Sequence, residues 1–182
     1  GRLILDGEAT INELLYTTSE VQQQHIRFVM NFEEGGTLAV VDPRNFGNVE
    51  LNPDETLLGP DAMHISNDDL DQVFTRSRAT IKAALLDQTK ISGIGNLLCD
   101  EILWRTGLSP TRAGCSLNSE EIERVTHVVR STIRDLTKRG GSHMGDLQPE
   151  RHRKGVCPTD GAQLEQTKVA GRTSWWCPEH QL

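Results

Sequence analysis

The stretch Leu85–Pro110 reads LLDQTKISGIGNLLCDEILWRTGLSP, and it decides the fold of the second half of this chain. An apolar helix ends at Leu86, a turn with glycines at 93 and 95 follows, and a second apolar helix runs from Asn96 to Gly107. A helix stop, a tight glycine turn, a polar N-cap at Asn96 and a glycine stop are typical of a helix-turn-helix unit.

The glycine turn has two interpretations. Gly93 and Gly95 permit positive φ angles or a close approach of backbone to a ligand. Asn96 begins a helix, where unpaired N–H groups and the helix dipole favour an anion such as phosphate. Alternatively, the glycines only allow two helices to pack closely. Both interpretations remain open at the level of this motif, since short motifs match often by chance.

The charge of the chain is unevenly distributed. The 182 residues carry a net charge of −7. Residues 1–71 hold three Lys or Arg against fourteen Asp or Glu, and residues 72–182 hold sixteen against twelve. The basic second part is therefore expected to meet any polyanionic partner. No apolar run reaches membrane-spanning length and no signal peptide opens the chain, so we expect a cytoplasmic protein without membrane contacts.

The first part of the chain has the pattern of an antiparallel sheet. Residues 25–32 (HIRFVMNF) alternate, with Ile26, Phe28, Met30 and Phe32 on one face, and a Glu-Glu-Gly-Gly turn leads to a partner strand at 37–41. Residues 49–51 are expected to form another short strand. Residues 1–4 look like the end of a strand already under way, which indicates that an earlier part of the domain is missing.

The second part is predicted to be helical. Ser66 or Asn67 starts a first helix, residues 80–86 form another, and Asn118 with Glu121 makes a capping box for a long helix that stops at Gly140. Residues 142–156 follow as a polar, basic connector that we expect to be flexible. The fold class is therefore α+β.

Two knuckles near the end of the chain have the spacing of a metal site. Cys157 and Asp160 form the first, Cys177 and His180 the second, and sixteen residues separate Asp160 from Cys177. This spacing is typical of a zinc ribbon, in which the metal stabilises a segment too short to fold alone. Asp160 is the unusual member, and His152 or water is the alternative fourth ligand. The competing interpretation is two free cysteines.

The hairpin between the knuckles carries an arginine at its tip. Arg172 lies in the run GRTSWW, and a rigid hairpin would present its guanidinium to phosphate. The alternative is an ordinary solvated surface charge. The tryptophans that follow are expected to pack the small ribbon.

The motifs together resemble the bacterial formamidopyrimidine-DNA glycosylase/endonuclease VIII family over essentially the whole chain. The resemblance rests on several segments in the family's order: HIRFVM at 25–30, DPRNFG at 42–47, LGP at 58–60, IKAALLDQ at 81–88, ISGIGN at 91–96, DEILWRTGLSP at 100–110 and GRTSWWCP at 171–178. It implies base-excision repair. Such enzymes flip an oxidised base out of double-stranded DNA, cut its glycosidic bond and nick the strand by β,δ-elimination as AP lyases.

The resemblance also assigns contacts to DNA that contains an oxidised base or an abasic site. Asn96, with Gly95 beside it, and Arg172 are expected to contact backbone phosphate. Arg44 is expected to face the orphaned base and Phe46 to wedge the stack. Zinc is implied as a structural cofactor, and the protein is expected to act as a monomer on the nucleoid.

The chain departs from the family at its start. The family's nucleophile is an N-terminal proline followed by a glutamate, and this chain begins Gly1-Arg2. We therefore expect this polypeptide to lack catalytic residues and to be inactive as a lyase, although the complete protein is a glycosylase. A non-catalytic DNA-binding module is the alternative, and an RNA-binding protein with a similar helical turn is the third.

These observations predict four segments. They are a partial N-terminal β-sandwich domain at 1–62, a helix-two-turn-helix domain at 63–141, the basic connector at 142–156 and the zinc ribbon hairpin at 157–182.

Overall fold

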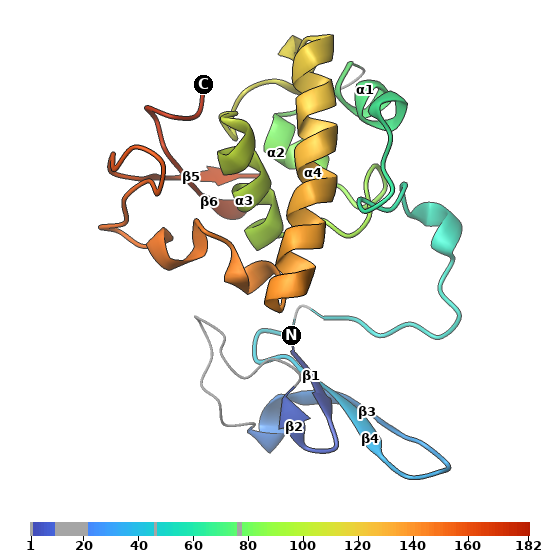
Figure 1. Ribbon diagram of the computed structural model, residues 1–182. Coiled ribbons are helices and arrows are strands. Elements are labelled where there is room, and N and C mark those ends of the chain that lie inside the picture. The colour runs from blue at the N-terminus through green and yellow to red at the C-terminus, as the bar shows by residue number, and fades with distance from the viewer. Residues whose placement is uncertain (1, 10–21, 46, 76–77) are drawn as a thin grey trace. The chain divides into compact units, whose positions relative to one another are not determined.

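The computed structural model describes residues 2–9, 22–45, 47–75 and 78–182 (Figure 1). It is an α+β structure with two small antiparallel sheets and a group of helices, as the sequence predicts. Contacts divide the chain into two compact units, Gly1–Asp54 and Glu55–Leu182. Each unit is described by itself below.

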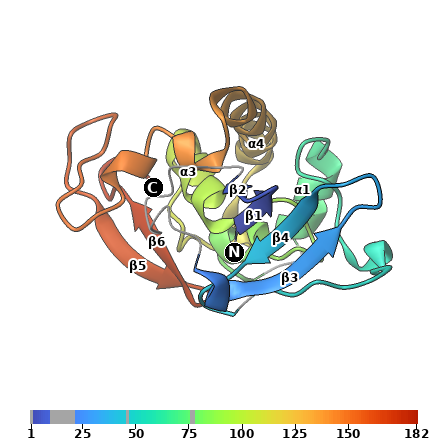
Figure 2. The ribbon, with the colours of Figure 1, turned by 90° about the horizontal axis from the view of Figure 1, so that it is seen from below.

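The first unit is built on a four-stranded antiparallel sheet with the order β2-β1-β4-β3. Its strands are β1 (Arg2–Leu5), β2 (Glu8–Ala9), β3 (Ile26–Asn31) and β4 (Thr37–Val41), and the 3₁₀ turn η1 (Gln23–His25) precedes β3. The long β3–β4 hairpin is clear in Figure 2. This hairpin confirms the predicted pair of strands, and its turn contains Gly35 and Gly36 at positive φ.

Two details of the sheet differ from the prediction. A register shift between Ile26 and Phe28 interrupts the alternation of β3, and Phe28 and Met30 are largely exposed, so the expected half-buried face is wrong. No strand forms at 49–51, where Leu51 is 89% exposed. An Asn-Pro turn follows at once, with Asn52 at a positive φ of 52°.

The second unit packs four helices around one apolar core. They are α1 (Asn67–Thr75), α2 (Ile81–Leu85), α3 (Asn96–Thr106) and α4 (Ser119–Arg139), with short turns η2 (Glu55–Leu57) and η3 (Gly114–Ser116). Figure 1 shows α3 and α4 side by side. The core includes Leu70, Phe74, Ile81, Leu85, Ile102, Val125 and Val129. These residues follow the spacings of three and four that the sequence shows.

The helix ends were mostly predictable from local signals. The capping box of Asn118 and Glu121 is present, and α4 ends at Gly140 in a left-handed conformation. Helix α3 likewise ends at Gly107 with a φ of 70°. The predicted N-cap at Asn96 is wrong, because Gly95 has the extended cap conformation and Asn96 is the first helical residue. The Asn96 side chain is thereby released from capping.

The segment 142–156 has fixed contacts, which corrects the expectation of a flexible connector. It forms two short 3₁₀ turns, η4 (Ser142–Met144) and η5 (Gln148–Glu150). Leu147 is fully buried and Arg151 is 7% exposed. The sequence is polar here, but several of its polar groups, among them Asp146 and Arg151, are bonded to α3.

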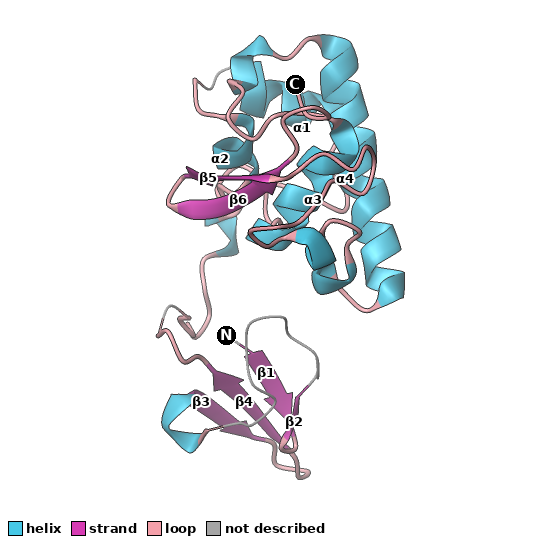
Figure 3. Cartoon of the chain, turned by 90° about the vertical axis from the view of Figure 1, so that its left-hand side faces the viewer, coloured by secondary structure: helices cyan, strands magenta, loops and turns pink. Residues whose placement is uncertain are grey.

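The last element is a two-stranded hairpin, β5 (Glu165–Val169) and β6 (Arg172–Trp176). Its turn uses left-handed conformations at Ala170 and Gly171. Figure 3 shows the hairpin crossing in front of the helices, with β6 against α3. A small second core lies beneath it, made of Trp104, Leu147, Cys157, Leu164 and Cys177. No helix among the described residues is long and apolar enough to span a bilayer.

Candidate nucleic-acid interface and metal centre

The start of α3 and the tip of the hairpin meet at one backbone carbonyl. The Asn96 Nδ2 donates a hydrogen bond to the carbonyl oxygen of Thr173 at 3.0 Å. Thr173 directly follows Arg172, which is exposed at the hairpin tip. Two residues that are 76 positions apart in the sequence, and that were assigned separately to phosphate, therefore lie at the same edge of the second unit. We call this place the α3–hairpin junction.

The Asn96 amide retains free hydrogen-bonding capacity at this junction. A side-chain amide has two N–H donors and one carbonyl oxygen. Its Nδ2 makes one hydrogen bond, to Thr173, and the buried Oδ1 has no partner among the described residues. The amide is thus held in one orientation by Thr173, with donor capacity left for a ligand.

The glycine turn before α3 leaves open space. Gly93 has a φ of +94°, which requires glycine, whereas Gly95 has an ordinary extended φ of −96°. A Cβ added at Gly95 would meet no atom within 4 Å. Neither packing nor backbone conformation therefore explains a glycine at 95. This weakens the interpretation that both glycines serve helix packing, and it favours close approach by a ligand.

Gln88 braces the turn, a role that the sequence did not reveal. Its Oε1 accepts from the backbone N–H of Gly93 at 3.0 Å, and its Nε2 donates to the carbonyl of Ile94 at 3.0 Å. The only sequence signal was its place in the segment IKAALLDQ. A glutamine that bonds a turn on both sides fixes the direction in which the first N–H groups of α3 point.

A buried charged cluster lies behind the junction. Asp100 of α3 forms ion pairs with Lys82 of α2 and with Arg151, the second at 2.7 Å. Its carboxylate also accepts from the Ser174 Oγ at 2.9 Å and from the Trp175 backbone N–H at 3.3 Å. We call Lys82, Asp100, Arg151 and Ser174 the Asp100 cluster. It joins α2, α3, the residue after η5 and β6.

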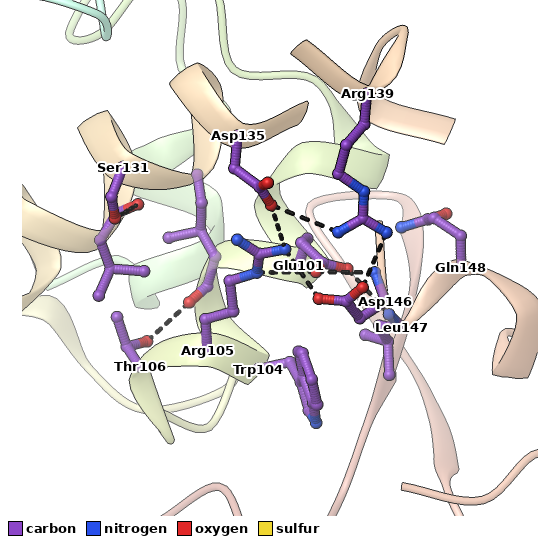
Figure 4. Close-up of polar contacts among 12 residues, drawn as sticks. Glu101, Trp104, Arg105, Thr106, Ser131, Asp135, Arg139, Asp146, Leu147 and Gln148 are labelled. Carbon is purple, nitrogen blue, oxygen red and sulfur yellow. Dashed lines mark hydrogen bonds and ion pairs between the residues drawn. The ribbon is translucent and has the colours of Figure 1, made fainter. Parts of the chain in front are cut away.

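A second charged cluster lies on another side of α3, and Figure 4 shows it in detail. Arg105 bonds to Glu101 at 2.8 Å and to Asp135 and Asp146 at 2.9 Å each. Arg139 pairs with Asp146 at 2.8 Å, and the buried Glu101 also accepts from the backbone N–H groups of Asp146 and Leu147. We call Glu101, Arg105, Asp135, Arg139 and Asp146 the Arg105 cluster. It fastens α4 and the 142–156 segment to α3.

Three of the four predicted metal ligands come together beneath the hairpin. One donor atom from each of Cys157, Asp160 and Cys177 lies within 4.8 Å of the other two, and the Cys177 Sγ is 3.3 Å from an Asp160 oxygen. The Trp104 Nε1–H donates to the Cys157 Sγ at 3.4 Å, and the His180 backbone N–H donates to the Cys177 Sγ at 3.4 Å. Such N–H donors stabilise thiolate sulfur.

The fourth predicted ligand is nearby but engaged. The His180 Nε2 lies 2.8 Å from the carbonyl oxygen of Trp104, and the two rings are tilted with centroids 6.1 Å apart. His180 is not part of the group of three, so its role as a ligand stays a prediction. The alternative ligand His152 is exposed and lies near Glu150 and Lys154.

The electrostatics of this group depend on whether a cation is present. Burial raises the pKa of the Cys177 thiol to about 11. The backbone N–H of Ala162, and weaker contacts with both thiols and with His180, lower the pKa of Asp160. Without a cation, a buried thiol with a raised pKa is protonated at neutral pH. A bound divalent cation converts it to the thiolate ligand. The donor set of two sulfurs and one carboxylate suits zinc.

The predicted intercalating loop belongs to the first unit. The buried Asp42 carboxylate accepts from the backbone N–H of Arg44 at 3.3 Å and of Gly47 at 2.6 Å, so it shapes the loop. Arg44 is exposed. Phe46 lies outside the described residues. The roles of Arg44 and Phe46 stay predictions.

A protein-family model matches residues 58–147, and its description is "Formamidopyrimidine-DNA glycosylase H2TH domain". The matched segment runs from the end of the predicted linker through all four helices to Leu147. It contains the glycine turn, Asn96 and both acidic residues at the centres of the two charged clusters.

Similar proteins extend this match to nearly the whole chain. The formamidopyrimidine-DNA glycosylase of Chloroflexus aurantiacus is 30% identical over 99% of this chain and 76% of its own length, and that of Geobacillus kaustophilus is 31% identical over 99% and 77%. Among solved structures, Lactococcus lactis Fpg in complex with DNA containing an abasic site has a TM-score of 0.75 at 25% identity, covering 99% of this chain and 71% of that one. The MutM (Fpg) protein of Thermus thermophilus has a TM-score of 0.74 at 30% identity, covering 88% and 70%. This chain belongs to the formamidopyrimidine-DNA glycosylase family.

Proposed function

We propose that this chain serves in DNA repair by binding double-stranded DNA that contains an oxidised base or an abasic site. The activity is that of the family, a DNA glycosylase and AP lyase. The observation that carries the proposal is the α3–hairpin junction, where the Asn96 amide bonds the residue next to Arg172. One amide donor, one guanidinium and the open N-terminus of a helix brought to one junction suit adjacent phosphates of one strand.

The individual contacts follow from the chemistry of each group. Asn96 and the backbone at Gly95 bind one phosphate, and Arg172 binds a neighbouring phosphate through its planar fork of donors. Arg44 faces the base left without a partner, and Phe46 occupies the space in the stack. A planar donor and an aromatic ring offset part of the few kcal/mol that flipping a nucleotide costs.

The residues proposed here bind DNA and do not carry out the chemistry. The family resemblance places the reacting amine and carboxylate on an N-terminal proline and glutamate, and none of the residues assigned here to DNA supplies either group. The protein acts as a monomer in the bacterial cytoplasm, on nucleoid DNA.

The proposed division of labour follows the predicted segments. Residues 1–62 belong to a β-sandwich domain that carries the intercalating loop, and residues 63–141 form a helix-two-turn-helix domain that carries Asn96. Residues 157–182 form a zinc ribbon that carries Arg172. The segment 142–156 joins the last two, and its buried Leu147 and Arg151 make it part of their packing.

Zinc is the proposed structural cofactor of the ribbon. Cys157, Asp160 and Cys177 hold it, because their donor atoms are already clustered and N–H groups are directed at both sulfurs. His180 is the proposed fourth ligand through Nδ1, since its Nε2 is bonded to the Trp104 carbonyl. Metal binding has to draw the ring toward the other three donors. The ion supplies folding free energy to the hairpin and takes no part in the reaction.

The proposal is tested by fluorescence anisotropy with labelled duplexes. DNA with a stable abasic analogue is expected to bind more tightly than undamaged DNA and than an RNA duplex of the same sequence. Asn96→Ala and Arg172→Ala should each weaken binding to the damaged and the undamaged DNA alike, because phosphate contacts carry no sequence information. Arg124→Ala, which removes an exposed charge on α4, is the matched control and should leave binding unchanged. Tighter binding to the RNA duplex would contradict the proposal.

A further inference from the structure

Asp100 is an unusual residue for the interior of a helix. It is 1% exposed, and it receives donors from three separate segments: Lys82 on α2, Arg151 after η5, and Ser174 with Trp175 on β6. A buried carboxylate is stable only when its oxygens are fully bonded. Here the bonding is supplied by residues from segments that are up to 75 positions away. The position of the hairpin on α3 is therefore set largely at Asp100.

Lys82 extends this cluster to the phosphate-binding residues. Its Nζ pairs with Asp100 and also donates to the Thr173 carbonyl at 3.2 Å. The same carbonyl accepts the bond from Asn96 at 3.0 Å. An unbroken series of contacts thus runs from Asp100 through Lys82 and Thr173 to Asn96, and Arg172 is the next residue along the chain.

The charge of the cluster favours an anion at the same place. Lys82 and Arg151 are two cations, and among the described residues Asp100 is the carboxylate that pairs with both. The side chains of Lys82 and Asp100 are fully buried and that of Arg151 is 4% exposed. Buried charge is screened little by salt. An excess of positive charge behind the junction therefore attracts a phosphate that binds in front of it.

We propose that Asp100 is a positioning residue that makes Asn96 and Arg172 act as one phosphate-binding unit. It acts through Lys82, which holds the Thr173 carbonyl against Asn96, and through Ser174 and Trp175, which hold β6 on α3. The inference rests on the proposed DNA binding and deepens it. Its consequence is that the two phosphate contacts are thermodynamically coupled, and that the coupling is lost when the cluster is altered.

The coupling is measured by a double-mutant cycle on binding to DNA with an abasic analogue. Asn96→Ala, Arg172→Ala and the double variant are compared in the native background. We expect the fold-loss of affinity in the double variant to be about tenfold smaller than the product of the two single fold-losses. Residues that share one hydrogen-bond network show such coupling. The same cycle is then repeated in a Lys82→Met background, and there the two losses should multiply.

Lys82→Met is the preferred change because it leaves Asp100 and Arg151 as a balanced pair and fills a similar volume. Asp100→Asn tests the carboxylate itself, but it leaves two cations without a partner and can fail to fold. Lys82→Met alone should also reduce the slope of log affinity against log salt by up to about 0.9, because Arg172 is then no longer held in place and its proposed phosphate contact is worth about that much. Arg105→Met, which lies on α3 with Asp100 but belongs to the other cluster, is the control and should leave the slope unchanged.

The outcomes separate the inference from the function on which it rests. Two results would overturn the positioning role while DNA binding through Asn96 and Arg172 stands. In the first, the two losses simply multiply in the native background. In the second, the coupling between them is as large in the Lys82→Met background as in the native one. If neither Asn96→Ala nor Arg172→Ala weakens binding, the proposed interface itself is wrong. A fall in melting temperature of Lys82→Met with unchanged slope and coupling would assign the cluster to stability alone.

Discussion

Asp100 and Glu101 are neighbours on α3, both are buried acids, and they sit at the centres of two different charged clusters. The Asp100 cluster has two cations for one carboxylate, and it faces the hairpin. The Arg105 cluster has three carboxylates for two cations, and it faces α4 and the 142–156 segment (Figure 4). The residues packed on the hairpin side of α3 thus leave an excess of positive charge there, and those on the other side leave an excess of negative charge.

The difference teaches how one short helix combines binding with stability. In the Arg105 cluster the outer acids Asp135 and Asp146 are 40% and 45% exposed. Salt therefore screens their ion pairs, which contribute only modestly to stability. In the Asp100 cluster the side chains are buried, and their contacts end at the carbonyl shared with Asn96. The first arrangement is satisfied within itself. We propose that a bound phosphate completes the second.

The largest expected effect comes from removing the metal, which takes the hairpin away from the Asp100 cluster. Cys177→Ala should abolish binding of one zinc per chain and weaken binding to abasic DNA by about 100-fold, since the hairpin folds on the metal. The four helices should keep their far-ultraviolet circular dichroism. Zinc is measured by mass spectrometry of the intact protein. Cys115→Ala, which removes an exposed cysteine, is the control and should keep the metal. Undiminished DNA binding by the metal-free protein would contradict the assignment of zinc as a structural cofactor.

The next effect tests the opposite cluster. Arg105→Ala leaves the buried Glu101 with two backbone N–H donors and no cation. We expect a loss of about 2 kcal/mol in the free energy of unfolding, below the full cost of breaking a buried pair because Arg105 is 20% exposed. Urea unfolding measures the loss. The salt dependence of DNA binding should not change. A changed slope would contradict the claim that only the Asp100 cluster is linked to DNA binding.

A smaller effect separates the two glycines of the turn. Gly93→Ala forces a residue with a Cβ into positive φ and should cost about 1 kcal/mol of stability. Gly95→Ala has an ordinary φ and free space, so its stability should stay within about 0.5 kcal/mol of the native value. Only its affinity for DNA should fall, because the added methyl group faces the proposed phosphate. Unchanged affinity of Gly95→Ala for DNA would contradict a phosphate contact at Gly95 and would favour the interpretation that the glycines serve helix packing.

The smallest effect concerns the cap of α4, an ion pair outside both clusters. Hydrogen bonds from Arg112 hold the pKa of Glu121 below its usual range. A lowered carboxyl pKa adds stability at neutral pH, and this is lost as the pH falls below the usual range and through the lowered value. Glu121→Gln should therefore cost about 0.5 kcal/mol at pH 7 and less at pH 3. Thermal unfolding at both pH values measures this, and an equal loss at both would rule out the charge as the cause.

The parts of the fold that the sequence predicted are those set by local signals. The capping box at Asn118, the glycine stops at 107 and 140, and the strand at 37–41 depend on residues a few positions apart. The strand proposed at 49–51 failed because a strand needs a neighbour, which no local pattern supplies. The connector was misjudged because the partners of Leu147 and Arg151 lie on α3, far away in the sequence.

The candidate site shows the same division. The knuckles around Cys157 and Cys177 follow from spacing, and three of their four donors meet as expected. Asp100, Lys82 and Gln88 escaped notice because each looks like an ordinary polar residue of a helix or turn. Their roles appear only where α2, α3 and β6 come together. Asn96 was identified from the turn, but the carbonyl that orients it belongs to Thr173, and no pattern joins the two.

The central claim is that Asn96 and Arg172 bind adjacent phosphates of damaged DNA from one junction. The most direct test is the salt dependence of binding to an abasic duplex, measured by anisotropy for the native chain and for Asn96→Ala/Arg172→Ala. Neutralised phosphates release counterions, and each charged contact contributes about 0.9 to the slope of log affinity against log salt. We predict that the double variant binds more weakly with a slope shallower by at least about 0.9. Two parallel lines at equal affinity would contradict the account.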